Sequence, residues 1–196
     1  MKPFAESCEQ NKHVILDVIR PLLQDAKDVF EIGSGTGQHA VFFAGEMNHL
    51  TWHTSDRAEN LEGIRQWLNE AKLTNTRGPI ELDVRYSQWP AIIYDAIFSA
   101  NTLHIMSWSE VEALFEQVAN VLGQHGHLLV YGPFNYQGEY TSESNRHFDQ
   151  WLKNRNPQSG IKHFEDVNHL AQQAGLILEN DFEMPANNRI LHWKKS

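Results

Sequence analysis

Two patterns of apolar and polar residues alternate along this chain. Short, nearly continuous apolar runs indicate buried parallel strands, and the segments between them carry apolar residues three or four positions apart, which indicates amphipathic helices. The alternation predicts an α/β fold with a mostly parallel sheet and helices on both faces. The expected strands are residues 28–32, 50–55, 79–84, 94–100, 127–131, 176–184 and 189–194, and the expected helices are residues 13–23, 38–47, 59–72, 107–123 and 163–174.

The helix after the fourth strand has recognisable capping residues. Ser107 and Glu110 form a capping-box pattern at its start, and Ser109 with Glu112 would serve equally well. Gly123 is expected just past its end, because that position often takes a left-handed conformation that glycine adopts without strain. The start of this helix is therefore predicted only to within two residues.

One long stretch, residues 134–161, breaks the alternation. It is polar and rich in Asn, Ser, Gln and Tyr, and it is expected to be irregular. A long irregular segment in a compact domain tends to be a lid or a binding element. No repeat, low-complexity tract or linker interrupts the rest of the chain, so residues 1–196 are expected to form one domain.

Composition restricts the class of protein. An apolar fraction of 41% and a charged fraction of 21% are typical of a folded chain, and a net charge of −9 argues against binding to nucleic-acid phosphates. No apolar run is long enough to cross a bilayer. Cys8 has no partner for an intrachain disulfide and the N-terminus lacks the apolar region of a signal peptide, so a cytoplasmic location is expected. No metal site is expected, because His125 and His127 have no third ligand at a recognised spacing.

The most informative segment is a glycine-rich turn after the first apolar strand. That strand ends in Glu31, and Gly33, Gly35 and Gly37 follow at alternate positions. Glycines allow positive φ and let a ligand lie against the main chain. The free N–H groups and the positive dipole end of the next helix face the same point. This combination predicts a cradle for a nucleotide-type cofactor.

The residue at position 38 indicates which cofactor fits the turn. A dinucleotide site has glycines at positions one, three and six, and counted from Gly33 the sixth position is Gln38. Glu31 would also repel a pyrophosphate, whereas it can hold an ammonium group directly or through water. The turn therefore favours a cationic ligand without phosphate.

Polar residues also follow the next three strands. Asp56 can accept hydrogen bonds from both hydroxyls of a ribose, and Asp83, beside the Val84 N–H, could accept one from an adenine amino group. Asn101 follows the fourth strand. Because ligands bind beyond the carboxyl ends of parallel strands, these residues and Glu31 should line one crevice. Adenosine, an amino acid and a sulfonium without phosphate together describe S-adenosylmethionine.

The glycine turn, Asp56, Asp83 and residues 95–104 resemble those of class I S-adenosylmethionine-dependent methyltransferases. More narrowly, the chain is similar to the methyltransferase-like 26 family. The resemblance implies a Rossmann-like class I methyltransferase fold, with a seven-stranded sheet whose last strand is antiparallel. One departure is Gln10, where relatives tend to have a basic residue before Asn11. The similar runs are residues 11–12, 31–39, 101–105, 131–134, 141–145, 148–149 and 184–188.

These residues and the resemblance predict three groups of site residues. His104 and Tyr131 are the catalytic candidates, with His104 as a general base, although a packed or cap-supporting histidine explains it equally well. The expected cofactor residues are Asn11, Glu31, Gly33, Ser34, Gly35, Gly37, His39, Asp56, Arg57, Asp83, Val84 and Asn101. The expected acceptor residues are Tyr136, Ser142, Asn145 and Asn187, each of which could instead satisfy loop backbone groups.

The expected activity is methyl transfer from S-adenosylmethionine to an unidentified small-molecule acceptor. The sulfonium is already activated, so alignment of acceptor, methyl and sulfur supplies much of the rate. Two alternatives stay open: a non-catalytic protein that binds S-adenosylmethionine, for example a scaffold, and an NAD-dependent oxidoreductase, against which Gln38 counts. Neither the acceptor nor the oligomeric state is predicted.

Overall fold

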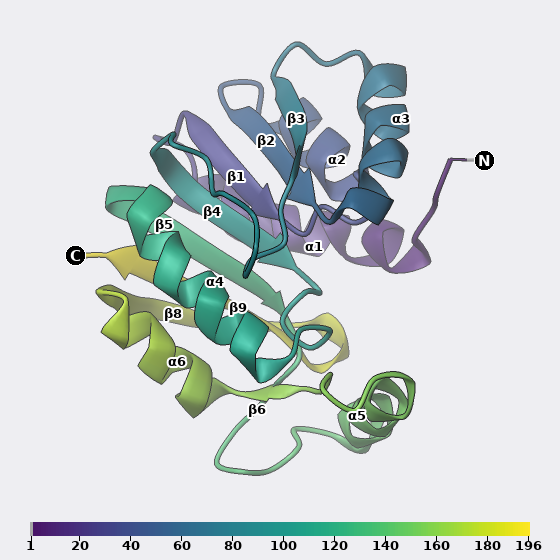
Figure 1. Ribbon diagram of the computed structural model, residues 1–196, viewed down its shortest axis with the longest axis vertical. Coiled ribbons are helices and arrows are strands. Elements are labelled where there is room, and N and C mark those ends of the chain that lie inside the picture. The colour runs from purple at the N-terminus through teal and green to yellow at the C-terminus, as the bar shows by residue number, and fades with distance from the viewer. Residues whose placement is uncertain (1) are drawn as a thin grey trace.

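The computed structural model describes residues 2–196, which form a twisted sheet with helices on both faces (Figure 1). Its seven strands lie in the order β3-β2-β1-β4-β5-β9-β8. The pairs of β9 with β5 and with β8 are antiparallel, and the other pairs are parallel. The predicted α/β fold and its antiparallel last strand are confirmed. The strands are β1 (Asp28–Ile32), β2 (Thr51–Asp56), β3 (Thr76–Glu81), β4 (Tyr94–Ala100), β5 (Leu122–Gly132), β8 (Leu176–Met184) and β9 (Asn188–Lys195).

The helices divide between the two faces, with α4 and α6 on the near face in Figure 1 and α1 and α2 behind the sheet. Strand β4 shows the consequence for the core. Ala96 and Phe98 pack with the residues of α1 and α2, whereas Ile97 packs with those of α4 and α6. Because successive side chains of a strand point to opposite faces, β4 is buried on both sides. The helices are α1 (Glu6–Leu22), α2 (Gln38–Glu46), α3 (Leu61–Ala71), α4 (Trp108–Val121), α5 (Glu143–Arg155) and α6 (Phe164–Gln173).

The remaining elements are short. Strands β6 (Phe134–Asn135) and β7 (Lys162–His163) form a separate parallel pair, and the 3-10 helices η1 (Ala58–Asn60) and η2 (Pro185–Asn187) lie in loops.

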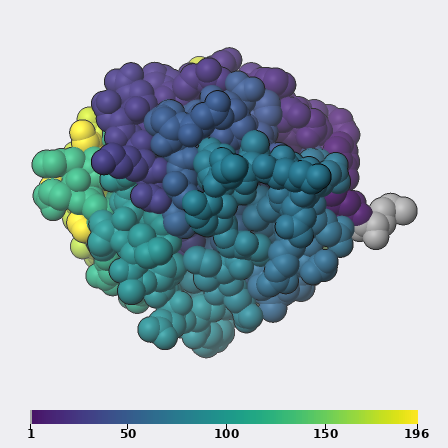
Figure 2. Space-filling view, turned by 90° about the horizontal axis from the view of Figure 1, so that it is seen from above, coloured from purple at the N-terminus to yellow at the C-terminus, as the bar shows by residue number. Residues whose placement is uncertain are grey.

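Seen from above, the purple-to-teal part of the chain covers most of the face, and the yellow C-terminal residues show only at its edge (Figure 2). None of the helices within residues 2–196 is both long and apolar enough to span a bilayer.

The prediction that residues 134–161 are irregular is wrong, because this segment contains α5. Ser142 caps that helix by accepting the Asn145 N–H at 3.1 Å. Its buried residues are Asn145, Asp149 and Leu152, of which only Leu152 is apolar. A helix anchored by two polar side chains shows no apolar stripe in the sequence.

Three predicted boundaries also need correction. Helix α1 begins at Glu6 instead of residue 13, in a polar first half that has no apolar periodicity. Strand β3 ends at Glu81, and the chain then turns, with the Asp83 N–H donating to Ser87 Oγ at 2.8 Å. Helix α4 ends at Val121 and the chain passes directly into β5, so Gly123 lies in a strand without positive φ. The Ser107 capping box at the start of α4 is confirmed.

The end of α3 gives a test of backbone strain. Lys72 is exposed and left-handed, with φ 51° and ψ 31°. Lys72→Gly should raise the free energy of unfolding by about 0.5–1 kcal/mol, because glycine adopts this conformation without a Cβ clash. Urea denaturation measures the change. Lys72→Ala keeps the Cβ and should stay within roughly 0.5 kcal/mol of the wild type. A glycine variant less stable than the wild type would contradict the prediction.

Candidate functional site

The glycine turn adopts the conformation that its glycines make possible. The φ angle is 74° at Gly33, 58° at Gly35 and 92° at Gly37. A Cβ on Gly33 would lie 2.4 Å from Thr102 Cγ2, and one on Gly37 would lie 3.2 Å from Ile64 Cα. A Cβ on Gly35 would meet nothing within 4 Å. The turn is therefore packed at both ends, and the backbone at its centre is open.

Asp56, the last residue of β2, holds the centre of the turn. Its Oδ2 accepts the Gly35 N–H at 2.6 Å. Its Oδ1 accepts the Arg57 N–H at 2.7 Å and the Asn60 side-chain amide at 2.8 Å. The carboxylate thus lies against the open backbone of Gly35.

A cavity of about 890 Å³ adjoins this turn. It is lined by residues that follow four parallel strands, β1 to β4, as expected where ligands bind beyond the carboxyl ends of a doubly wound sheet. The predicted cofactor residues among its lining are Gly33, Ser34, Gly35, His39, Asp56, Arg57, Asp83, Val84 and Asn101. The fold therefore brings nine of the twelve together around one space.

The N-terminal segment also lines the cavity, and nothing in the sequence pattern indicated this. Gln38 fixes the segment in place: its Oε1 accepts the Ala5 N–H at 2.6 Å, and its Nε2 donates to Glu9 at 2.8 Å. The position where a dinucleotide site needs glycine is thus occupied by a side chain that clamps α1 to the turn. The N-terminal lining residues are Pro3, Ala5, Ser7 and Cys8.

Glu31 lies beneath the turn and does not line the cavity. It is 1% exposed, and its carboxylate accepts the Trp52 indole N–H at 3.1 Å. Burial, with the charge of Asp56 nearby, raises the pKa of Glu31 to about 7, against weaker opposing hydrogen bonds from Trp52 and Ser34. Glu31 is therefore partly protonated at neutral pH, and its carboxyl group is separated from the cavity by the backbone of the turn. Gly37, the residue that caps α2, also stays outside the lining.

Asn11, His39 and Tyr131 form a buried cluster beside the cavity. The Nε2 of His39 and the Oδ1 of Asn11 are 2.7 Å apart. Burial lowers the pKa of His39 to about 4 and raises the pKa of Tyr131, against an opposing hydrogen bond from Asn11. Both rings are therefore neutral at neutral pH. Of these three residues, His39 reaches the cavity lining.

His104 is buried close to the cavity but is not part of its lining. Its ring packs edge-on against Phe148, with ring centroids 5.2 Å apart. Burial, and then the charge of Lys162, lowers the pKa of His104 to about 4. The imidazole is therefore neutral at neutral pH. His104 directly precedes Ile105 and Met106 in the sequence, and both of these residues line the cavity.

The four predicted acceptor residues lie outside the cavity lining. Tyr136 donates its hydroxyl to Asp181 at 2.8 Å, on the β8 side of the molecule. Ser142, Asn145 and Asn187 do lie together: Ser142 caps α5, and the Asn145 amide donates to the Asn187 carbonyl at 3.1 Å. These contacts connect α5 to the turn between β8 and β9.

The polar segment 134–161 contributes other residues to the cavity. Asn156 and Gln158 line it together with Asn101, Ile105 and Met106. The Gln158 N–H donates to Asn156 Oδ1 at 3.0 Å, which holds this loop in a tight turn. These lining residues carry no formal charge.

Within residues 2–196, no group of three or more His, Cys, Asp or Glu side chains could hold a metal ion. The two histidines singled out in the sequence do not act as a pair. His127 contacts His192, with Nδ1 and Nε2 2.9 Å apart, and His125 is exposed with a φ of 61°.

A sequence model of the family described as "Protein of unknown function (DUF938)" matches residues 2–195. The chain belongs to the DUF938 family.

Solved structures of methyltransferases are similar to this DUF938 protein. The S-adenosylmethionine-dependent methyltransferase SibL in its apo form has a TM-score of 0.81 and 21% identity over 96% of this chain and 55% of its own. A putative O-methyltransferase from Nostoc punctiforme has a TM-score of 0.83 and 15% identity over 96% and 56%. Human N-acetylserotonin methyltransferase, in complex with S-adenosylmethionine, has a TM-score of 0.80 and 16% identity over 97% and 53%.

These likenesses show that the DUF938 chain has the Rossmann-like fold of class I methyltransferases. The chain spans about half the length of the solved structures that it matches.

The buried carboxyl group of Glu31 gives a prediction about pH. Because burial raises its pKa in the folded state from 4.5 to about 7, its stabilising contribution is complete below pH 4.5 and is lost as the pH rises to 7. Glu31→Gln removes this titration. Its free energy of unfolding, relative to the wild type, should rise between these pH values by on the order of 2–3 kcal/mol and then level off.

Urea denaturation at a series of pH values measures this difference. Glu143→Gln is the control for the same replacement at an exposed position, since that side chain is 73% exposed. A flat difference for Glu31→Gln over the same range would show that Glu31 titrates normally.

Proposed function

We propose that this DUF938 protein binds S-adenosylmethionine and transfers its methyl group to a small-molecule acceptor. The observation that carries the proposal is the pairing of Asp56 with Gly35, in which a strand-end carboxylate lies 2.6 Å from the backbone N–H of an open glycine turn. The pair faces a cavity of about 890 Å³, which is of the size that small-ligand pockets have.

The groups around the cavity fit the proposed cofactor. Asp56 can accept hydrogen bonds from ribose hydroxyls, and Asp83 with the Val84 N–H can pair with the edge of an adenine. The glycine backbone leaves room for the amino-acid part, and a positive charge placed there would favour the ionised form of Glu31 behind it. Gln38 fills the place of the third dinucleotide glycine, which disfavours NAD.

The cofactor, when bound, supplies a methyl group on a positively charged sulfur. The residues of the chain bind the cofactor, orient it toward the acceptor and exclude water. Asn101 follows β4 with a left-handed φ of 57°, and its N–H donates to the Tyr131 carbonyl at 2.9 Å, so its side chain starts from a fixed point in the cavity wall. Orientation of acceptor, methyl and sulfur supplies much of the rate of methyl transfer.

His104 is the proposed general base for an acceptor that must lose a proton. Burial lowers its pKa to about 4, so the imidazole is neutral at neutral pH but only weakly basic, and the role requires an acceptor that reaches it from the cavity through the segment of Ile105 and Met106. The buried Tyr131 is the second catalytic candidate. We further propose that the acceptor is held near Asn101, Asn156 and Gln158, and that the narrower relationship is to the methyltransferase-like 26 family.

Calorimetric titration with S-adenosylmethionine tests the cofactor assignment. Asp56→Ala should weaken binding by roughly 1–3 kcal/mol, because charge-assisted hydrogen bonds are lost. Asp95→Ala is the matched control: Asp95 also accepts backbone N–H groups, from Lys27 and Asp28, but it lies at the opposite end of the strands. Equal affinities of the Asp56→Ala variant and the wild type would remove Asp56 from the site.

Formation of S-adenosylhomocysteine separates an enzyme from a binding protein. The wild type, incubated with S-adenosylmethionine and a small-molecule fraction of cell extract, should produce S-adenosylhomocysteine, and Asp56→Ala should lose at least about 80–90% of that activity, since a 1.4 kcal/mol loss is tenfold. Binding without turnover across such fractions would favour the non-catalytic alternative.

A further inference from the structure

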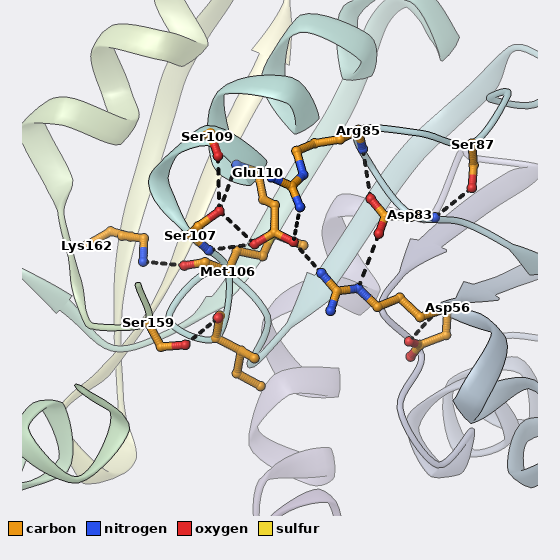
Figure 3. A network of polar contacts seen from close by, with 12 residues as sticks. Asp56, Asp83, Arg85, Ser87, Met106, Ser107, Ser109, Glu110, Ser159 and Lys162 are labelled. Carbon is orange, nitrogen blue, oxygen red and sulfur yellow. Dashed lines mark hydrogen bonds and ion pairs between the residues drawn. The ribbon is translucent and has the colours of Figure 1, made fainter. Parts of the chain in front are cut away.

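Glu110, in the first turn of α4, carries two sets of contacts on its two carboxylate oxygens. Its Oε2 accepts the Ser107 N–H at 2.7 Å and the Ser107 hydroxyl at 2.8 Å. Its Oε1 contacts the guanidinium of Arg57 and lies 3.7 Å from Nη2 of Arg85. Figure 3 shows the carboxylate between Ser107 and Arg85. The sequence indicates the first set as a capping box, and nothing in it indicates the second.

The arginine contacts connect Glu110 to the cofactor end of the cavity. Arg57 directly follows Asp56, and its N–H donates to Asp56 Oδ1 at 2.7 Å. Its Nε lies 3.8 Å from Asp83 Oδ2. Arg57 therefore extends from the two strand-end acids of the proposed cofactor site to α4, and both Arg57 and Glu110 line the cavity.

The capping contacts connect Glu110 to residues 105–107, which contact the loop of Asn156 and Gln158 where the acceptor is proposed to be held, called here the acceptor end. Ser107 directly follows Ile105 and Met106, whose side chains belong to the cavity lining. The Ile105 carbonyl accepts the Ser159 hydroxyl at 2.6 Å. The Met106 carbonyl accepts the Lys162 ammonium at 2.7 Å (Figure 3). These bonds tie residues 101–107 to the loop that carries Asn156 and Gln158.

Charge keeps this connection intact at neutral pH. Burial alone would raise the pKa of Glu110, but the hydrogen bonds from Ser107, together with Arg57 and Arg85, outweigh it and hold the pKa below its ordinary value. The side chain of Glu110 is 9% exposed and that of Arg57 is 47% exposed, so water and salt screen the ion pair only from the arginine side.

We propose that Glu110 is a positioning residue that couples occupation of the cofactor end to the order of the acceptor end. A ligand that fixes Asp56, Asp83 and Arg57 thereby fixes Glu110, the Ser107 cap and residues 101–107. Since such coupling is reciprocal, an ordered acceptor end also favours the bound cofactor. The inference rests on the proposed function, because the ligand that transmits the order is the proposed cofactor or its demethylated product.

Hydrogen exchange with and without S-adenosylhomocysteine tests the coupling. In the wild type, saturating ligand should slow exchange in residues 33–37 and also, by roughly fivefold or more, in residues 101–107 and 156–162. Glu110→Gln keeps a side chain able to complete the capping box but removes the charge. It should retain the slowing in residues 33–37 and lose most of it in the two distant segments.

Two further variants make the result specific. Arg57→Gln breaks the same ion pair from the other side and leaves the α4 cap untouched, so at saturating ligand it should show the same selective loss. Glu112→Gln, whose carboxylate accepts the Trp108 indole N–H at 2.9 Å on the same helix, should behave as the wild type.

The outcomes separate the two proposals. A wild type that does not bind S-adenosylhomocysteine overturns the proposed function and the coupling with it. A wild type that binds, with equal slowing in the Glu110→Gln and wild-type proteins or with no slowing beyond residues 33–37, overturns the coupling alone.

Discussion

The left-handed backbone of the turn at Gly33, Gly35 and Gly37 is the constraint on which the rest of the site depends. It lets the chain reverse from β1 into α2 while the N–H groups of Gly33 and Ser34 bond back to the Ser55 carbonyl at 3.1 and 2.9 Å. These bonds fix the end of β2 against the turn and place the carboxylate that follows within reach of Gly35. A Cβ at either end of the turn would crowd a neighbouring residue, Thr102 at Gly33 or Ile64 at Gly37.

Negative charge gathers around this backbone, and its distribution suits a cation better than an anion. Glu31 is buried behind the turn, and Asp56 and Asp83 lie on the cavity wall. The cationic side chains of the wall, Arg57 and Arg85, are both directed to Glu110. A pyrophosphate at the turn would be repelled by the negative charge of these carboxylates, whereas a sulfonium or ammonium would be stabilised by it.

The topology and the strand-end acids could be predicted from sequence, because a buried parallel sheet leaves continuous apolar runs and places the residues after its strands at one edge. Helix α5 could not, because Asp149 and other polar side chains anchor it and Leu152 is its only buried apolar residue. The direction of a loop side chain depends on partners far away in sequence. Tyr136 faces Asp181, and Glu110 faces Arg57, which directly follows β2, so neither role could be derived from local spacing.

The most direct measurement is a pair of calorimetric titrations of the wild-type protein, one with S-adenosylhomocysteine and one with NADH, under the same conditions. Both ligands contain an adenosine that could reach Asp56, but only NADH brings a pyrophosphate to the turn. A turn without a third dinucleotide glycine and with Glu31 behind it predicts saturable binding of S-adenosylhomocysteine and no binding of NADH at the same concentrations. Saturable binding of NADH without binding of S-adenosylhomocysteine would contradict it.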